Sequence, residues 1–465
     1  MTVVDHDVTT GVTAAVQAAR AAAPGWAELG FTGRSRRLRA WRRAIARGAT
    51  ELAGLIHREM GKPLPDAMLE IAMALEHLAW AERNAEAVLG PRTVRPGALT
   101  ANHKCVVEYR PYGVVGVIGP WNYPVFTPLG SIAAALAAGN TVVFKPSEYT
   151  PEVGRWLGEA FGDASVLGVV TGDGRTGAAL CRSGVDKIGF TGSTATGRRV
   201  MAACAESVTP VLMECGGKDA LLVDADADLD AAADAAVWGG MSNAGQTCLA
   251  VERVYVHRDV HDAFLEKVVA LARGVRAGEH IGPVTMPGQV EVIDSHIRDA
   301  LDRGGRAVLG GPDAVRGRFV EPTILTGVPE DSAAVTEETF GPTLTVTAVA
   351  DMDEAVELTN RSRYGLGATV FSRRNGEAIA RRIRSGAVSV NAFVAHATVP
   401  ALPLGGTGAS GFGRVHGADG LREFAYPRAT TAQRFPSPVP LTSFRRPPWA
   451  DTLVRVLIAV RHGWR

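Results

Sequence analysis

The sequence has few cysteines, almost no net charge and no long apolar run. Its five cysteines are scattered over 465 residues without a Cys-x-x-Cys pair, which excludes a disulfide framework and favours a reducing compartment. Lysine and arginine total 49 against 48 acidic residues, so no global field attracts nucleic acid. No run reaches the ~18 apolar residues of a membrane-spanning helix, and the first residues lack the basic and apolar regions of a secretory signal. We therefore expect a cytoplasmic protein that does not bind nucleic acid.

Composition and periodicity indicate a large α/β protein. Apolar residues make up 46% of the chain and charged residues 21%, as in ordinary globular proteins, and the length predicts two or three domains. Residues 9–90 have helical periodicity. Short β-rich runs then alternate with helical stretches, which predicts a parallel, doubly wound sheet; the runs are 114–118, 141–144, 165–170, 187–190 and 210–213. A second α/β stretch has predicted strands at 250–257, 318–325, 343–350, 367–371 and 387–391.

Unusual polar motifs follow several of these strands, where parallel sheets bind ligands. They are Gly119-Pro-Trp-Asn-Tyr-Pro124, Phe144-Lys-Pro-Ser-Glu148, Phe190-Thr-Gly-Ser-Thr-Ala-Thr-Gly197, Glu214-Cys-Gly-Gly-Lys218 and Asn243-Ala-Gly-Gln-Thr-Cys248. Each motif alone is weak evidence, because a lone cysteine is usually a small buried residue and an acid before two glycines is usually part of a turn. None of the eleven histidines belongs to an H-E-x-x-H motif, so we expect no metal site.

Taken in order, these motifs closely resemble those of the NAD(P)-dependent aldehyde dehydrogenases. The resemblance covers about residues 10–431 and includes Glu337-Glu-Thr-Phe-Gly-Pro342 and Leu404-Gly-Gly-Thr-Gly-Ala-Ser-Gly-Phe-Gly-Arg414. It implies the fold of that family: a Rossmann-like NAD-binding domain (1–97 and 114–216), an α/β catalytic domain (217–410) and a small oligomerisation β element (98–113 and 422–433). It also implies a homodimer or homotetramer.

The resemblance implies oxidation of an aldehyde to a carboxylic acid. Cys248 matches the family nucleophile, whose thiolate forms a thiohemiacetal. Asn122 matches the side-chain donor that stabilises the oxyanion together with the backbone N–H of Cys248. Transfer of a hydride to the nicotinamide leaves a thioester, and Glu214 matches the base that activates water to hydrolyse it. The presence of Glu214 argues against the CoA-acylating branch of the family.

The resemblance also assigns residues to the cofactor. Lys145 and Glu148 match groups that bind the adenine ribose, and Ser193 matches a pyrophosphate contact at a helix N-terminus. Glu338 matches the ligand of the nicotinamide ribose, with Phe340 beside it, and Trp121 completes the cofactor-binding set. A carboxylate at Glu148 accepts a hydrogen bond from a 2′-hydroxyl but repels a 2′-phosphate, so we expect NAD, with NADP as the alternative.

Several departures from the family pattern bear on the substrate. Leu404 replaces a common phenylalanine, Gly130 replaces a common aromatic residue, and His416-Gly417 resembles the class-3-like and semialdehyde-type branches. The segment 392–404 offers only His396 as a cation, which disfavours a succinic-semialdehyde specialist. The alternatives to a general NAD-dependent enzyme are an NAD(P)-dependent semialdehyde dehydrogenase and a non-catalytic binding or structural member, against which the intact Cys248, Glu214, Asn122 and Lys145 argue.

Residues 434–465 form a basic, proline-rich tail. They include six arginines and a single acid, Asp451. The run 453–460 predicts a short amphipathic helix that is too short to span a bilayer. We expect it to pack on the protein's own dimer, with peripheral contact to an anionic membrane as the alternative.

Overall fold

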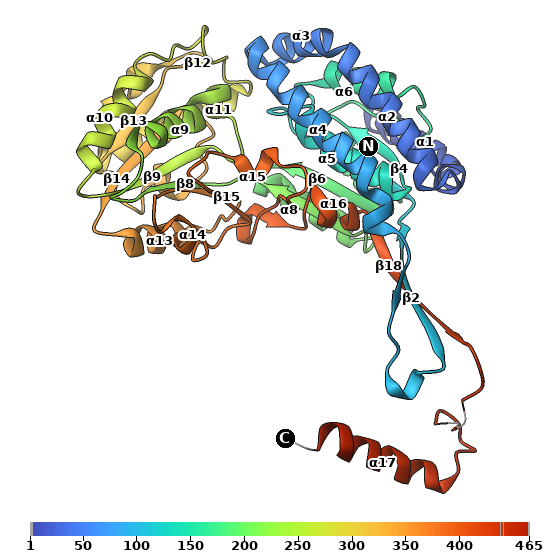
Figure 1. The fold of residues 1–465 in the computed structure, drawn as a ribbon. Coiled ribbons are helices and arrows are strands. Elements are labelled where there is room, and N and C mark those ends of the chain that lie inside the picture. The colour runs from blue at the N-terminus through green and yellow to red at the C-terminus, as the bar shows by residue number, and fades with distance from the viewer. Residues whose placement is uncertain (1–2, 438, 440, 464–465) are drawn as a thin grey trace. The chain divides into compact units, whose positions relative to one another are not determined.

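The computed structural model describes residues 3–437, 439 and 441–463 (Figure 1). The chain divides into two compact units. Residues 1–89 and 110–426 form the first unit, and residues 90–109 and 427–465 form the second. Within the described residues, no helix is both long and apolar enough to cross a membrane.

The first unit begins with four helices: α1 (Val3–Glu28), α2 (Gly30–Arg47), α3 (Ala49–Met60) and α4 (Leu64–Leu89). Helix α2 buries Leu38, Trp41 and Ile45, which recur at helical spacing, and directs most of its arginines to solvent. Helix α3 ends at Gly61, whose φ of 76° lies in the left-handed region that favours glycine. The chain then turns into α4 through Lys62, a residue with a role in the site.

The first sheet has six strands in the order β17-β7-β6-β3-β4-β5. All are parallel except β17, which pairs antiparallel with β7. Every residue of β3 and β4 is buried, as expected of parallel strands covered by helices on both faces. This confirms the doubly wound sheet. Its strands and helices are β3 (Val114–Ile118), α5 (Phe126–Ala138), β4 (Thr141–Lys145), α6 (Pro151–Phe161), β5 (Leu167–Val169), α7 (Gly174–Arg182), β6 (Lys187–Gly192), α8 (Thr194–Ala205), β7 (Val211–Cys215), β17 (Gly411–Phe412) and α16 (Gly417–Glu423).

The second sheet has seven strands in the order β10-β13-β14-β9-β8-β15-β16. All pair in parallel except β10 with β13. Its elements are β8 (Asp219–Val223), α9 (Leu229–Met241), β9 (Val251–His257), α10 (His261–Ala272), α11 (Pro287–Asp302), β10 (Arg306–Leu309), β13 (Thr323–Thr326), α12 (Ala333–Thr336), β14 (Thr343–Val349), α13 (Met352–Arg361), β15 (Gly367–Phe371), α14 (Gly376–Ala380), β16 (Ala387–Val390) and α15 (Ala395–Thr398). The single strand predicted over 318–325 is wrong: Pro322, which has no N–H to donate, separates β12 (Phe319–Val320) from β13.

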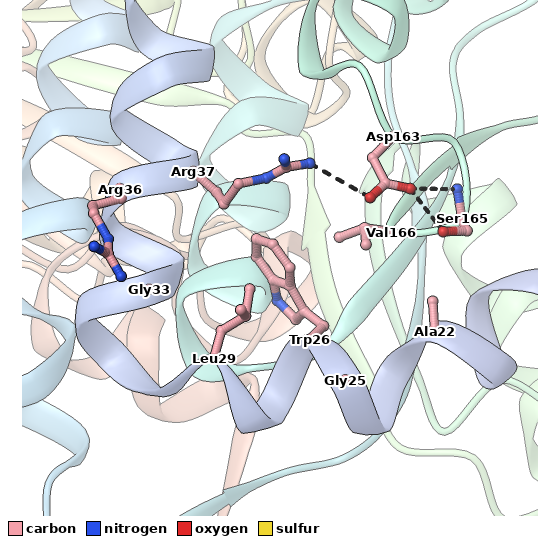
Figure 2. A pocket seen from close by; sticks show the side chains of 10 residues that line it. All are labelled: Ala22, Gly25, Trp26, Leu29, Gly33, Arg36, Arg37, Asp163, Ser165 and Val166. Atoms are coloured by element: carbon pink, nitrogen blue, oxygen red, sulfur yellow. Dashed lines mark hydrogen bonds and ion pairs between the residues drawn. The ribbon is translucent and has the colours of Figure 1, made fainter.

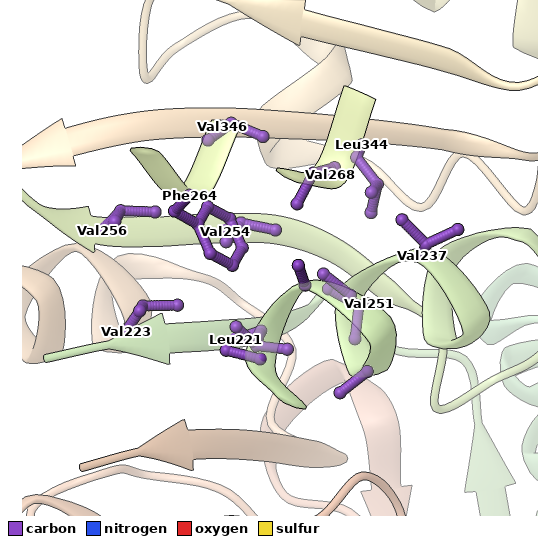
Figure 3. Close-up of a cluster of buried hydrophobic side chains, with 14 of the residues drawn as sticks. Leu221, Val223, Val237, Val251, Val254, Val256, Phe264, Val268, Leu344 and Val346 are labelled. Carbon is purple, nitrogen blue, oxygen red and sulfur yellow. The ribbon is translucent and has the colours of Figure 1, made fainter. Parts of the chain in front are cut away.

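One apolar core of this second sheet lies under helices α9 and α10, and another packs against α13 and α14. Figure 3 shows Phe264 of α10 against valines of the strands, with Leu221 and Leu344 beside them. Phe264 is fully buried, and burial of such a side chain contributes about 1.5–3 kcal/mol. The apolar cores of the two sheets consist of different residues. The loops between the sheets do not form these cores and can therefore carry polar residues.

The second unit contains a three-stranded sheet in the order β1-β2-β18. Its strands are β1 (Arg92–Val94), β2 (His103–Pro111) and β18 (Ala425–Gln433), with β11 (Val315–Arg316) pairing separately with β12 in the first unit. The strand predicted over 98–113 starts only at His103, because Ala98–Thr100 form a 3-10 turn, and residues 422–423 still belong to α16. The tail helix is longer than predicted: α17 spans Pro448–His462, and Pro448 suits the first helical turn.

Candidate active site

The candidate nucleophile Cys248 lies in a conformationally unusual loop after α9. Asn243, Ala244 and Gly245 have φ angles of 52°, 57° and 72°. Such backbone is rare for residues other than glycine and marks sites that the surrounding structure holds in place. Asn243 Nδ2 donates to the carbonyl oxygens of Gln246 and Asn122, both at 3.1 Å, so these hydrogen bonds hold the loop.

The environment of Cys248 disfavours its ionised form. Removal of water from around its sulfur raises the pKa of the Cys248 thiol well above its usual range, and the Glu214 carboxylate raises it further. The residue itself remains partly exposed. A thiol in these surroundings is protonated at neutral pH and needs a base to become a nucleophile.

Glu214 supplies a carboxyl group suited to that task. It lies on β7, paired with Thr191 of β6 on one side and Gly411 of β17 on the other, and Thr191 Oγ1 donates to its Oε2 at 3.2 Å. Burial raises the pKa of Glu214 to about 7, against smaller opposing effects of that hydrogen bond and of the Arg414 charge. A group with a pKa near 7 exchanges protons readily in either direction at neutral pH.

Asn122 is buried and joined to the cysteine loop by hydrogen bonds. Its Nδ2 donates to the carbonyl oxygen of Gln246 at 3.0 Å. The hydroxyls of Tyr123 and Thr247 lie 3.1 Å apart. The loop after β3 and the loop before β9 are therefore held together within two residues of Cys248, which brings two of the predicted catalytic residues into one place.

A buried ion pair that sequence analysis missed supports Asn122. Lys62 Nζ donates to Glu70 Oε2 at 2.5 Å and to the carbonyl oxygen of Asn122 at 2.8 Å. Glu70 Oε1 accepts the N–H groups of Val125 and Phe126 at 2.8 and 3.1 Å. The two charges are almost inaccessible to solvent, so each satisfies the other while fixing the loop after β3. In the sequence, Lys62 in Gly61-Lys-Pro63 looks like an ordinary surface residue.

Two glycines that follow β7 allow Cys248 and Glu338 to approach the backbone closely. A methyl group on Gly217 would lie 2.7 Å from the carbonyl oxygen of Cys248, and one on Gly216 would overlap the carboxylate of Glu338. Gly217 N–H also donates to Glu338 Oε1 at 3.2 Å. The Gly-Gly pair after Cys215 is therefore required by close packing of two other site residues.

The loop that carries Glu338 and Phe340 is fixed by a second buried pair, Lys218 with Glu252. Glu252 accepts the N–H groups of Thr339 and Phe340 at 2.8 and 3.0 Å. Phe340 has a φ of 52°. Burial and the Glu252 charge raise the pKa of Glu338 to about 8. Sequence analysis assigned no role to Lys218, although it ends the motif Glu214–Lys218, and it missed Glu252, which belongs to none of the motifs.

Four of the predicted cofactor residues contact one another in pairs, and Ser193 begins a helix after β6. Lys145 Nζ lies 3.2 Å from Glu148 Oε2, and Glu148 is half-exposed. The rings of Trp121 and Phe340 pack edge to face at 5.6 Å. Ser193 caps α8, with its Oγ accepting from the N–H of Thr196 at 3.2 Å. A carboxylate beside a lysine, a capped helix N-terminus and an aromatic pair suit a dinucleotide.

Strand order explains why these residues meet. Strands β7, β6, β3 and β4 are consecutive neighbours and parallel. Glu214 lies at the end of β7, Ser193 follows β6, Trp121 and Asn122 follow β3, and Lys145 ends β4. The carboxyl ends of neighbouring parallel strands lie along one edge. Among the described residues, no group of three or more histidine, cysteine, aspartate or glutamate side chains could hold a metal ion.

A groove of about 450 Å³ lies elsewhere in the first unit. Figure 2 shows Arg37 reaching across it toward Asp163, with Trp26 and Leu29 below. Its lining comes from α1, α2 and the turn before β5. The predicted catalytic and cofactor residues are not among the residues that line it, so it is separate from the candidate site.

Comparison with known proteins gives one consistent family. The model of the aldehyde dehydrogenase family matches residues 2–430. A 4,4'-diapolycopene aldehyde oxidase from Methylomonas is 37% identical over 425 residues, which cover 88% of this chain and 79% of the relative. A putative succinate-semialdehyde dehydrogenase [NADP(+)] from Mycolicibacterium smegmatis is 35% identical and covers 97% of this chain and 90% of the relative.

Solved structures agree with the fold. An E. coli NADP dependent enzyme superposes with a TM-score of 0.88 at 33% identity, covering 91% of this chain and 90% of that one. The lactaldehyde dehydrogenase of E. coli superposes with a TM-score of 0.87 at 30% identity, covering 91% of each chain. The chain therefore belongs to the aldehyde dehydrogenase family and is an NAD(P)-dependent aldehyde dehydrogenase.

Proposed function

We propose that Cys248, Glu214 and Asn122 carry out the oxidation. Glu214 takes the thiol proton of Cys248, and the sulfur then bonds to the carbonyl carbon of the aldehyde. Asn122 Nδ2 and the N–H of Cys248 donate to the oxyanion of the resulting thiohemiacetal. The nicotinamide, when bound, accepts the hydride that leaves the aldehyde carbon. The observation that carries this proposal is the geometry that joins the three residues. Asn122 Nδ2 donates to the carbonyl oxygen of Gln246, two residues before Cys248, and Gly217, three residues after Glu214, packs closely against the carbonyl oxygen of Cys248.

Hydrolysis completes the cycle. Glu214 first releases the thiol proton to solvent. It then removes a proton from a water molecule, whose oxygen bonds to the thioester carbon while the carbon–sulfur bond breaks, and it passes that proton to the leaving sulfur. The products are a carboxylic acid and the free Cys248 thiol. In sum, aldehyde, water and NAD⁺ give carboxylic acid, NADH and a proton.

The cofactor that the site favours is NAD. Glu148 is a half-exposed carboxylate within hydrogen-bond distance of Lys145 and Ser147. It can accept a hydrogen bond from a ribose 2′-hydroxyl, whereas a 2′-phosphate would place like charges together. Lys145 and Glu148 would hold the adenine ribose, Ser193 and the start of α8 the pyrophosphate, and Glu338, Phe340 and Trp121 the nicotinamide end. NADP remains the alternative, since it appears in the names of relatives.

The substrate that the residues favour is an aldehyde with an uncharged, apolar chain. The segment 392–404 has His396 as its one candidate cation, and burial lowers the pKa of His396 to about 4. A neutral imidazole does not compensate a substrate carboxylate. Leu404 adds an aliphatic side chain. These features favour a substrate like the diapolycopene aldehyde named for the Methylomonas relative over succinate semialdehyde.

We also propose the domain and assembly plan that the family resemblance implies. Residues 1–97 and 114–216 bind NAD, residues 217–410 form the catalytic domain, and the strands near 98–113 and 422–433 join copies into a homodimer or homotetramer in the cytoplasm. The exposed residues of β18 support this use, because an exposed strand edge is suited to pairing.

NADH formation on a panel of aldehydes tests the function. We expect kcat/KM for long apolar aldehydes to exceed that for succinate semialdehyde at least tenfold, and NAD to be preferred over NADP. Cys248→Ala should fold and bind NAD but form no NADH, whereas the matched variant Cys105→Ala should retain activity. Full activity in Cys248→Ala would refute the nucleophile, and a preference for succinate semialdehyde would refute the substrate class.

A further inference from the structure

The tail helix α17 exposes an unusual amount of apolar surface. Trp449 is 55% exposed, Ile458 56% and Val460 64%, and Phe444 just before the helix is fully exposed. Ala450 is the one buried residue among those described in the helix. Large apolar side chains gathered on a short segment normally mark a contact with another surface.

Trp449, Leu453, Leu457 and Val460 form an apolar stripe along one side of the helix, whereas Ile458 lies on the opposite side. Trp449, Leu453 and Leu457 recur every four residues, and Val460 follows three residues later. At about 100° per residue these side chains lie on one face, while Asp451, Arg455 and His462 lie on the opposite side. The helix is therefore amphipathic.

Basic residues lie just before the helix and along it. Arg445 and Arg446 precede the helix, and Arg455 and Arg461 lie within it. Arg446 pairs with Asp451 at 3.1 Å, the one acid between residues 434 and 463. Arg445, Arg455 and Arg461 are all exposed. The segment thus combines an apolar face with an excess of positive charge.

The helix has the wrong length for a membrane span and the right composition for a membrane surface. Its 15 residues give a length of about 22 Å, short of the ~30 Å hydrocarbon core. An interfacial helix instead buries an apolar face that carries tryptophan and leucine, while arginines contact anionic headgroups. The match to the aldehyde dehydrogenase family model ends at residue 430, so this segment lies outside the region that the family model covers.

We infer that residues 441–463 bind the surface of an anionic lipid membrane. Positive charge favours lipid over pairing with the same segment of a second copy, because a two-fold contact would bring the arginines of both copies together. An anionic membrane complements both the apolar face and the charge. This inference does not depend on the proposed catalytic residues, and it brings the enzyme to a surface where apolar aldehydes dissolve.

Vesicle co-sedimentation of the full chain tests the inference. We expect binding to vesicles of phosphatidylcholine with phosphatidylglycerol to be at least tenfold tighter than to phosphatidylcholine alone, and to weaken as salt is raised. Arg455→Glu with Arg461→Glu should weaken binding at least tenfold, and so should Trp449→Ser with Leu453→Ser. A chain ending at Gln433 should lose binding but keep its oligomeric mass and aldehyde oxidation.

A matched charge reversal on the enzyme body controls for total charge. Arg43→Glu with Arg47→Glu alters two exposed arginines one turn apart on α2 and should leave vesicle binding unchanged. Equal loss of binding in this control would overturn the assignment to α17. So would absence of a preference for anionic vesicles, or a chain ending at Gln433 whose mass falls, since α17 would then hold copies of the protein together.

Discussion

At the scale of single residues, surroundings decide what a side chain does. Glu206 is exposed, and its hydrogen bond with Arg182 lowers its pKa. Glu214 is buried beside a threonine hydroxyl, and its pKa rises to about 7. Identical carboxyl groups therefore differ in protonation at neutral pH, and Glu214 is the one suited to act as a base.

The first prediction concerns Glu214. Glu214 can act as a base only while its carboxyl group is ionised. Below its pKa of about 7 the ionised fraction falls, so hydrolysis should slow about tenfold per pH unit. Glu214→Gln should abolish this pH dependence and slow turnover by about 100-fold or more, the usual range for a lost general base. Burst kinetics of NADH and mass spectrometry should then show a slower first turnover and little thioester on Cys248, because Glu214 also takes the thiol proton in the first step.

Glu206→Gln is the matched control for Glu214→Gln. It makes the same chemical change at an exposed position and should leave both turnover and its pH profile unaltered. Unchanged turnover in Glu214→Gln, with an unchanged pH profile, would rule out its role as the base.

At the scale of elements, the parallel strands place the candidate site residues along one edge of the sheet, and the N-terminus of a helix adds backbone N–H groups there. Helix α8 directly follows β6 and begins at Ser193, whose side chain caps the first turn. Helix α9 begins at Asp228, whose side chain accepts from the N–H of Ala231 at 3.2 Å. The two caps make the same local interaction, but only α8 begins at the edge with the other cofactor residues.

The second prediction separates capping from cofactor binding. Ser193→Ala and Asp228→Ala should each lower the free energy of unfolding by about 1 kcal/mol, the usual value of an N-cap. Ser193→Ala should also raise KM for NAD by about 2–10-fold, since it loses one hydrogen bond to the pyrophosphate. Urea unfolding and steady-state kinetics measure the two effects. A KM for NAD that changes equally in both variants, or in neither, would contradict the assigned contact.

At the scale of the whole molecule, the small three-stranded sheet is suited to assembly. All residues of β18 after Ala425 are exposed, and β18 is an outer strand of its sheet. Outer strands with unpaired backbone groups readily pair with another chain. The ion pair of Arg428 with Glu108, with Nε donating at 2.7 Å, ties β18 to β2.

The third prediction concerns the oligomer. Light scattering should give two or four times the chain mass of 48.9 kDa. Thr431→Pro in β18 should lower that mass, because proline blocks pairing at an edge. Thr93→Pro makes the same change in β1, the other outer strand, and should leave the mass unaltered. A full chain that is monomeric, or two variants that behave alike, would contradict the use of β18.

Local sequence patterns were sufficient to predict the alternation of strands and helices and to find the polar motifs that follow the strands. The strand expected over 318–325 failed at Pro322, and the strand expected over 98–113 started late because of a 3-10 turn. The family resemblance then identified Cys248, Glu214 and Asn122, which the structure places around two joined loops. The motifs that carry these three predicted residues could be found because each motif is contiguous in the sequence.

The amino-acid sequence by itself determined the order of the elements, the edge of the sheet that carries the polar motifs and the family. Only the tertiary structure decided which charges are buried. Lys62 and Glu70 lie eight residues apart, and Lys218 and Glu252 lie 34 apart, yet both pairs hold site loops through backbone groups. No local pattern distinguishes them from surface charges, because burial depends on segments that come from elsewhere in the chain. The pKa of Glu214 has the same origin: the sequence supplies the carboxyl group, and packing removes the water around it.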